Sequence, residues 1–311
     1  MLADSYLTRG ITALAKAGST KSMVGHPGAA VVAAYFFSRE HQLDKRALAG
    51  LKGAVDTIIA DGGKTWAPTL DDQGALFSPF PKEQADEALL LDIAAALEGK
   101  ITRLRESGHC TIFAALALRG LRHKPDLITP SIVAGICNLI SLFNDNPGQG
   151  YYGAEKGWLR GLPVDPAQHL SPYQTLEDVV DTAFGELLGH DKIKRKGYGS
   201  HLHLITHTGA LIDLAEMGYT DLAQQGFEAH QTHIMLLRSL PPDLDAEGNS
   251  QRIQHRDLDP LTHAYWDVFQ TDENRIRDHE CKVNYAFFRI INYVKDRALR
   301  DQCMEQLGYL N

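Results

Sequence analysis

The sequence of 311 residues is poor in cysteine and has no segment typical of a membrane span. Its four cysteines, at positions 110, 137, 281 and 303, form no Cys-x-x-Cys pair, which is typical of reduced thiols in the cytosol. No signal segment stands at the N-terminus, and no apolar run approaches the roughly 20 residues that a membrane span needs. We therefore expect a cytoplasmic protein with no membrane partner.

An excess of positive charge and the common catalytic motifs are also absent. The formal net charge of -8 disfavours nucleic acid as a partner, and we interpret the short basic run at 192–196 as a solvated loop face. No His-Glu-x-x-His motif occurs, so a standard zincin is excluded, and neither a Gly-x-Ser-x-Gly nor a Walker motif is present. The glycine-rich string at 148–153 follows a predicted helix rather than a strand, so we interpret it as a loop.

Strand-like alternation is nearly absent, whereas apolar residues recur with helical spacing along the chain. We predict an all-α protein of paired helices, in a quasi-repeated toroid-like or solenoid-like arrangement. We expect a single helical domain over 1–311, with a candidate seam in the long loop at 144–173. Besides a helix that follows His26, the predicted helices span 3–17, 43–60, 83–104, 109–122, 131–143, 175–188, 200–217, 220–239, 260–269, 275–295 and 299–308.

A histidine recurs at the start of apolar helices. His26 precedes an apolar helix, and so do His109, His203 and His279, at intervals of 83, 94 and 76 residues (26 to 109, to 203, to 279). If these are equivalent positions of a fourfold quasi-repeat, the four helix starts open onto one cavity. Helix dipoles there favour neutral imidazole, which is the form that binds a metal. The alternative is four unrelated histidines, some of which cap helices.

Two assignments stay open: which histidine is the third ligand, and whether Lys282 in the last histidine helix belongs to the metal site. His201, His203 and His207 lie within one helix, and alignment of the repeats favours His203 as the ligand. His207 then becomes a candidate catalytic or substrate-contacting group, or a core histidine. Lys282 follows His279 by three residues on the same helical face, so it suits the metal site if its amine is neutral or carbamylated by CO2. Otherwise Lys282 extends to solvent.

Two further sets of side chains are candidates for a functional role. The loop at 144–173 contains Tyr151, Tyr152, Trp158 and Arg160, which suit an apolar or aromatic substrate, or a loop that packs on itself. His230 and His233 are spaced three residues apart on a predicted helix. We expect them to form an outward polar face rather than a second metal site.

The histidine segments resemble those of the questin oxidase-like family. The matching segments are Gly25-His26-Pro27-Gly28-Ala29-Ala30, Gly108-His109-Cys110-Thr111-Ile112, His203-Leu204-Ile205-Thr206 and His279-Glu280-Cys281-Lys282, in the family's order and at similar spacing over most of the chain. Three departures stand out. Gly25 replaces an asparagine, Leu116 replaces a second histidine, and His207 has no counterpart. These departures bear on the substrate side of the site more than on the histidines.

The resemblance implies an oxidoreductase that opens or oxidises aromatic polyketides such as anthraquinones. It also implies a non-haem metal, most simply iron, held by the histidines with the help of Lys282. NADPH is a further cofactor that the resemblance suggests. We therefore expect a metal-dependent oxygenase that uses O2, with Zn or Mn as alternative metals. The alternatives are a hydrolase or lyase that uses a zinc-bound water, and a helical binding scaffold without catalysis.

Overall fold

The structure is a computed structural model that describes residues 1–66, 75–148, 170–189, 193–195, 200–238, 250–252, 255–271 and 277–310. The predicted all-α class is confirmed, because helices make up nearly all regular structure in these ranges. Two strands of three residues, β1 (Ile193–Arg195) and β2 (Ser250–Arg252), pair antiparallel with Ile193 opposite Arg252. None of the described helices combines the length and apolar character of a membrane span. The toroid-like or solenoid-like arrangement stays a prediction.

The chain forms two compact units. Unit 1 comprises Met1–Gly99, Ile112–Phe143 and Leu258–Tyr285, and unit 2 comprises Lys100–Thr111, Asn144–Asp257 and Ala286–Asn311. One boundary falls between residues 143 and 144, where the loop of the predicted seam begins. The prediction of a single domain stays a prediction. The helices that contribute residues to both units are α4 (Leu90–Ile101), α5 (His109–His123) and α12 (Arg277–Ile290).

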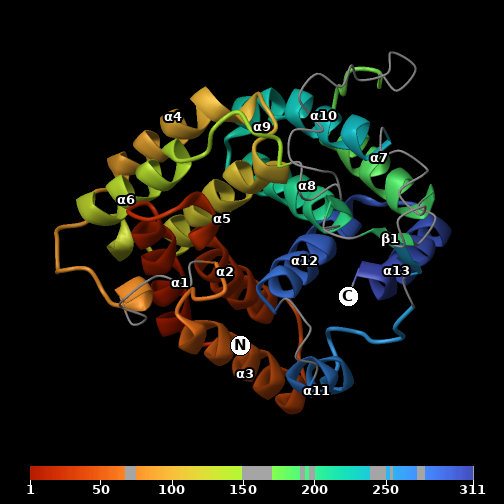
Figure 1. The fold of residues 1–311 in the computed structure, drawn as a ribbon, viewed down its shortest axis with the longest axis horizontal. Helices are drawn as coiled ribbons and strands as arrows, with labels where there is room; N and C mark the ends of the chain where they lie inside the picture. Colours follow the sequence, from red (N-terminus) through yellow and green to blue (C-terminus); the bar gives the residue numbers. More distant parts are fainter. Residues whose placement is uncertain are drawn as a thin grey trace. The chain divides into compact units, whose positions relative to one another are not determined.

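Unit 1 is built around α2 (Gly25–Glu40), whose residues from Gly25 to Ser38 are all buried. A helix that is apolar on every side belongs in the interior, which explains the run AAVVAAYFF. The neighbouring helix α1 (Asp4–Ala17) lies close against it (Figure 1), and a side chain at Gly28 would meet the Leu14 backbone nitrogen at 2.6 Å. The remaining helices of unit 1 are α3 (Lys45–Asp61), α6 (Pro130–Ser141) and α11 (His263–Thr271).

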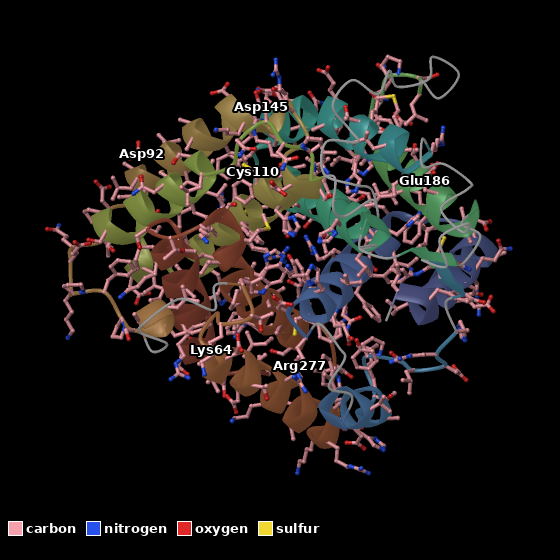
Figure 2. All side chains as sticks on the ribbon, viewed as in Figure 1. Lys64, Asp92, Cys110, Asp145, Glu186 and Arg277 are labelled. Carbon is pink, nitrogen blue, oxygen red and sulfur yellow. The ribbon has the colours of Figure 1, made fainter. Side chains whose placement is uncertain are left out.

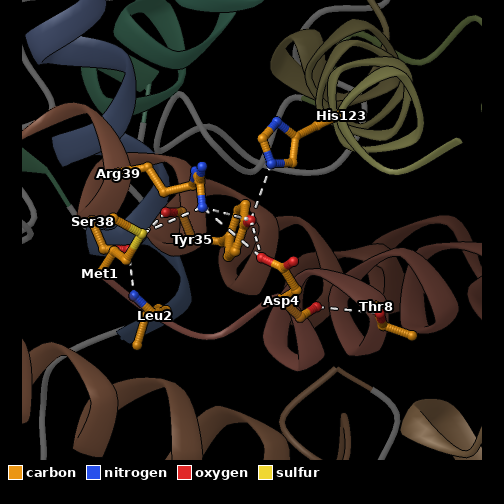
Figure 3. Close-up of polar contacts among 8 residues, drawn as sticks. All are labelled: Met1, Leu2, Asp4, Thr8, Tyr35, Ser38, Arg39 and His123. Atoms are coloured by element: carbon orange, nitrogen blue, oxygen red, sulfur yellow. Dashed lines mark hydrogen bonds and ion pairs between the residues drawn. The ribbon is translucent and has the colours of Figure 1, made fainter.

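A polar network fastens the N-terminus of unit 1 (Figure 3). The Tyr35 hydroxyl donates to Asp4 Oδ1 at 2.6 Å and lies 3.1 Å from His123 Nε2. The backbone N–H of Leu2 donates to Ser38 Oγ at 2.9 Å. Burial, followed by the hydrogen bond to Asp4, raises the pKa of Tyr35 to about 12, so this hydroxyl stays a donor at neutral pH. We interpret the network as an anchor of α1 on α2.

Unit 2 packs α7 (Leu176–Gly189) and α10 (Phe227–Arg238) against α8 (Ser200–Glu216). Its core includes Leu104, Ala183, Leu204, Ala229, Ile234, Leu236 and Leu237. At the surface, Glu186 on α7 (Figure 2) accepts a hydrogen bond from Arg238 Nε at 2.9 Å. Unit 2 also contains α9 (Thr220–Gln225) and α13 (Arg297–Leu310).

Two predicted helices differ from the structure. The segment 220–239 is two helices, α9 and α10, which are separated at Gly226. A side chain at Gly226 would meet Leu211 Cδ2 at 2.6 Å, so α8 approaches closely at the break. The segment 83–104 begins later, with a 3-10 turn over Glu87–Leu89, where Asp86 accepts the Ala88 N–H at 3.0 Å. The other short 3-10 turns are η1 (Ser22–Val24), η2 (Ala75–Phe77), η4 (Glu106–Gly108), η5 (Pro125–Leu127) and η9 (Ile291–Tyr293).

Candidate metal centre

His26 enters the site from the second position of α2, directly after the 3-10 turn η1. Its Nδ1 lies 2.8 Å from the backbone carbonyl of Met23. A carbonyl oxygen only accepts, so Nδ1 carries the ring proton and the lone pair of the neutral ring lies on Nε2. His26 therefore does not cap the helix with its side chain, and Nε2 is the ring nitrogen whose lone pair could bind a metal.

His279 is the second histidine of unit 1 and lies at the third position of α12. Its ring centroid is 4.9 Å from that of His26, and its Nδ1 lies 3.3 Å from Asp278 Oδ1. Burial and the nearby charge of Lys282 lower the pKa of His279, which therefore favours the neutral ring. Burial alone would raise the pKa of Asp278, but interactions with His279 above all lower it to about 2. An ionised carboxylate beside Nδ1 favours the tautomer that carries its proton on Nδ1 and its lone pair on Nε2.

Unit 2 contains a matching pair, His109 and His203. His109 is the first residue of α5 and follows the 3-10 turn η4, and its Nδ1–H donates to the carbonyl of Glu106. As in His26, the hydrogen bond joins Nδ1 to the backbone carbonyl three residues earlier. The two helix starts therefore orient their histidine rings in the same way. His203 is the fourth residue of α8, and its ring centroid lies 4.4 Å from that of His109 at an interplanar angle of 55°.

The turn directly before His109 has a left-handed backbone conformation at three successive residues. The φ angles are 44° at Glu106, 54° at Ser107 and 88° at Gly108. A left-handed conformation costs an ordinary residue about 1–2 kcal/mol, and such strain tends to cluster at functional sites. Backbone hydrogen bonds compensate, because Glu106 N donates to Asn146 O at 2.7 Å and Ser107 N donates to Pro147 O at 2.9 Å.

The four predicted histidines come close enough to share one metal ion. One ligand atom from each of His26, His109, His203 and His279 lies within 4.8 Å of every other, and within the described ranges this is the group of His, Cys, Asp and Glu side chains that could hold a metal. Their exposed fractions are between 0% and 6%, so water competes little for these nitrogens. His203, rather than His201 or His207, is the member from α8.

Lys282 is buried, so the alternative in which it extends to solvent is wrong. Its exposed fraction is 3%, and its Nζ lies 5.5 Å from the centroid of the Phe113 ring. Among the described residues this nitrogen has no hydrogen-bond partner. Burial lowers the pKa of Lys282 to about 8, because a charged amine is poorly solvated there.

His207 lies one turn beyond His203 on α8 and is fully buried. Its ring packs against Gly108, where a side chain would meet His207 Cγ at 2.7 Å. Burial lowers the pKa of His207 to about 4, and neither ring nitrogen has a hydrogen-bond partner in the described part of the chain. His207 is therefore a neutral imidazole next to the turn that delivers His109, and its catalytic role stays a prediction.

His230 and His233 do not form an outward face, and that prediction is wrong. Both are fully buried, because α10 turns its histidines toward α8. The Thr208 hydroxyl donates to the Leu204 carbonyl at 2.8 Å, so it accepts from His230 Nε2 at 2.8 Å. His230 Nδ1 then accepts from the Tyr173 hydroxyl at 3.3 Å. These partners explain His230 as a core histidine.

The predicted substrate residues cannot be placed. Tyr151, Tyr152, Trp158 and Arg160 lie outside the described residues, so their contact with a substrate stays a prediction. Cys110, which follows His109, is buried (Figure 2), and burial raises its pKa to about 12. A thiol of that pKa is a poor nucleophile at neutral pH.

Two residues that contact the candidate ligands were not predicted from the sequence. Trp66 stacks on His26, with ring centroids 3.7 Å apart and an interplanar angle of 13°. Its indole N–H donates to Asp278 Oδ2 at 2.6 Å. An acidic residue directly before a candidate ligand was a usable signal for Asp278. Nothing in the sequence around Trp66 indicates its position.

The four histidines could hold a metal ion. Neutral imidazole nitrogens bind iron, zinc and copper, and three of the four rings have their Nδ1 next to an oxygen atom. The residues present therefore fit a bound metal without prescribing which one. Comparison of the chain with family models, curated proteins and solved structures finds no match.

Proposed function

We propose that the protein is a non-haem metal-dependent oxidoreductase, an oxygenase whose metal is held by His26, His109, His203 and His279. The observation that carries the proposal is the mutual approach of four buried imidazoles to within 4.8 Å. Four buried imidazoles this close together suit a metal ion, because a metal binds the neutral form of the ring that burial favours.

The number of histidines favours iron over zinc. Catalytic zinc sites keep three protein ligands and leave the fourth position for water, so four histidines would fill a tetrahedral site. A six-coordinate metal such as iron or manganese keeps two positions after binding four imidazoles. Bound iron would supply redox chemistry with O2 at those positions. A zinc hydrolase or lyase is therefore the weaker reading of this ligand set.

The substrate class rests on the resemblance to the questin oxidase-like family. We propose an aromatic or polyketide-like small molecule as substrate, O2 as co-substrate and, by the same resemblance, NADPH as a candidate reductant. The aromatic loop residues Tyr151, Tyr152 and Trp158, with Arg160, would contact that substrate. His207 is the candidate proton acceptor, since burial keeps its ring neutral at physiological pH.

We further propose that Lys282 acts at the site as a carbamate. Four neutral imidazoles supply no negative charge. A buried amine with no hydrogen-bond partner among the described residues fits poorly as an ammonium ion. Its neutral amine would add to CO2, forming the N–C bond of an N-carboxylate and releasing one proton. The product is an anionic oxygen ligand. The alternative is an unmodified neutral amine close to the histidines.

The carbamate predicts a signal in carbon NMR. In protein equilibrated with ¹³C-bicarbonate, we expect one slowly exchanging carbamate resonance that disappears on acidification. Lys282→Met, which keeps the length and apolar stem of the side chain, should lack it. Lys64→Met, at the surface of unit 1 (Figure 2), should retain it. A wild-type protein without this resonance at saturating bicarbonate would leave Lys282 as an unmodified amine.

Metal content and O2 consumption test the function itself. Protein purified without a histidine tag should contain close to one iron or manganese ion per chain, and it should consume O2 when given an aromatic quinol. One zinc ion per chain with hydrolytic turnover would favour the hydrolase or lyase instead. A protein that binds no metal, even after incubation with Fe²⁺, Mn²⁺ or Zn²⁺, would be a helical scaffold and would overturn the proposal.

A further inference from the structure

We infer that Trp66 and Asp278 form a brace that positions His26 and His279 for metal binding. The inference rests on the metal site proposed above and assigns a role to two residues outside the ligand set. All four side chains belong to unit 1. The brace predicts that metal affinity depends on an indole N–H that never touches the metal.

The turn after α3 brings Trp66 to the site. The helix ends at Asp61, and the next two residues are left-handed, with φ of 63° at Gly62 and 90° at Gly63. Glycine adopts these angles without the steric cost that other residues incur. Two hydrogen bonds close the turn, from Thr65 N to Asp61 Oδ2 at 3.2 Å and from Trp66 N to Gly63 O at 3.0 Å. The indole is thereby directed at His26.

Trp66 contacts His26 directly through the face of its indole ring. It contacts His279 indirectly, through a hydrogen bond from the indole N–H to Asp278. The indole stacks nearly parallel on His26, at 3.7 Å between ring centroids. Its N–H donates to one oxygen of Asp278 at 2.6 Å, and the other oxygen of that carboxylate lies 3.3 Å from His279 Nδ1. A single aromatic side chain therefore constrains both histidines of unit 1.

Each contact acts on a different property of the ligands. The stack limits rotation of the His26 ring, whose Nδ1 is already held by Met23. The carboxylate fixes the tautomer of His279 and makes its Nε2 a stronger donor to a metal. The indole hydrogen bond keeps that carboxylate in place, and a charge-assisted hydrogen bond with low exposure to water is strong. Ligands ordered in advance lose less entropy when the metal binds.

Titration with Co²⁺, followed by its ligand-field absorption, measures the effect without reference to activity. Trp66→Phe keeps a six-membered aromatic ring beside His26 but removes the N–H together with the second ring of the indole, so we expect affinity to fall about 10–100-fold with altered bands. The matched control is Trp266→Phe, which loses the equivalent hydrogen bond to Pro260 O (2.8 Å) elsewhere in unit 1. Its Co²⁺ affinity and spectrum should equal those of the wild type.

A double-mutant cycle shows whether Trp66 acts through Asp278. Asp278→Ala should weaken Co²⁺ binding, and adding Trp66→Phe to it should change little more, because the acceptor is already gone. Asp278→Asn, which keeps the side-chain volume, replaces Asp278→Ala if circular dichroism shows that the alanine variant is unfolded. Independent, additive losses would show that the two residues do not form one brace.

Tryptophan fluorescence tests whether Co²⁺ binds beside Trp66. Paramagnetic Co²⁺ at His26 should quench Trp66, so the quenched fraction should persist in Trp266→Phe and vanish in Trp66→Phe. A wild type that binds no Co²⁺ would overturn the proposed metal site and the brace together. A wild type that binds Co²⁺ while Trp66→Phe matches its affinity and spectrum would overturn the brace alone.

Discussion

Replacing His279 with alanine is expected to abolish stable metal binding. Outer contacts of a metal ligand are typically worth about 10–100-fold in affinity, so removing the ligand itself should cost more than about 100-fold. The change also leaves Asp278 without the imidazole N–H that it faces at 3.3 Å. We expect metal per chain, measured by elemental analysis after dialysis against a weak chelator, to fall close to zero.

Controls separate this loss from a general effect of removing a histidine. His263→Ala removes a partly exposed histidine of α11 that lies 3.6 Å from Asp44, and it should leave metal content unchanged. His201→Ala tests the choice of ligand on α8 and should also retain the metal, whereas His203→Ala should lose it. If His279→Ala fails to fold, His279→Gln keeps most of the volume. Full metal occupancy in a folded His279 variant would show that the ligand set is misassigned.

Replacing Gly108 with alanine is expected to destabilise the protein by about 2–5 kcal/mol. The residue has φ of 88°, a conformation that costs an alanine about 1–2 kcal/mol. The added methyl group would also lie 2.7 Å from His207 Cγ and 2.9 Å from its Nδ1, and overpacking of this kind costs about 1–3 kcal/mol. Denaturant unfolding measures the change. Because Gly108 precedes His109, metal affinity should fall as well.

Gly185→Ala is the matched control for that substitution. Gly185 lies within α7, where a side chain would meet nothing within 4 Å. Alanine there should stabilise the helix by about 0.5–1 kcal/mol, since it removes the entropy cost of glycine. If Gly108→Ala also left stability within about 0.5 kcal/mol of the wild type, the left-handed turn before His109 would be wrong.

Local sequence signals were enough to predict most helices and the four candidate ligands. Helical periodicity depends on residues three and four apart, so it survives without tertiary information. The histidines were found because each stands at a helix start, and His26 and His109 also share a hydrogen bond to the carbonyl three residues earlier. A feature that recurs locally is visible in the sequence before any packing is known.

Features that depend on packing between distant segments were not predictable. The hydrogen bond between Trp66 and Asp278 joins residues 212 positions apart. The burial of His230 depends on the neighbouring helix, and local polarity indicated the opposite. The left-handed backbone at Glu106 and Ser107 has no sequence signature, because neither residue is a glycine. Tertiary contacts stabilise these buried polar side chains and left-handed backbone angles, which the local sequence disfavours.

X-ray absorption at the edge of the bound metal tests the central claim most directly. Protein loaded with one metal ion per chain should show four imidazole nitrogens at about 2.0–2.2 Å, recognisable by the multiple scattering of the rings. The carbamate of Lys282 would add an oxygen to that set. The spectrum of His279→Ala, reloaded at high metal concentration, should show one imidazole fewer. A first shell of oxygen or sulfur ligands without histidine would contradict a metal centre built on these four helix starts.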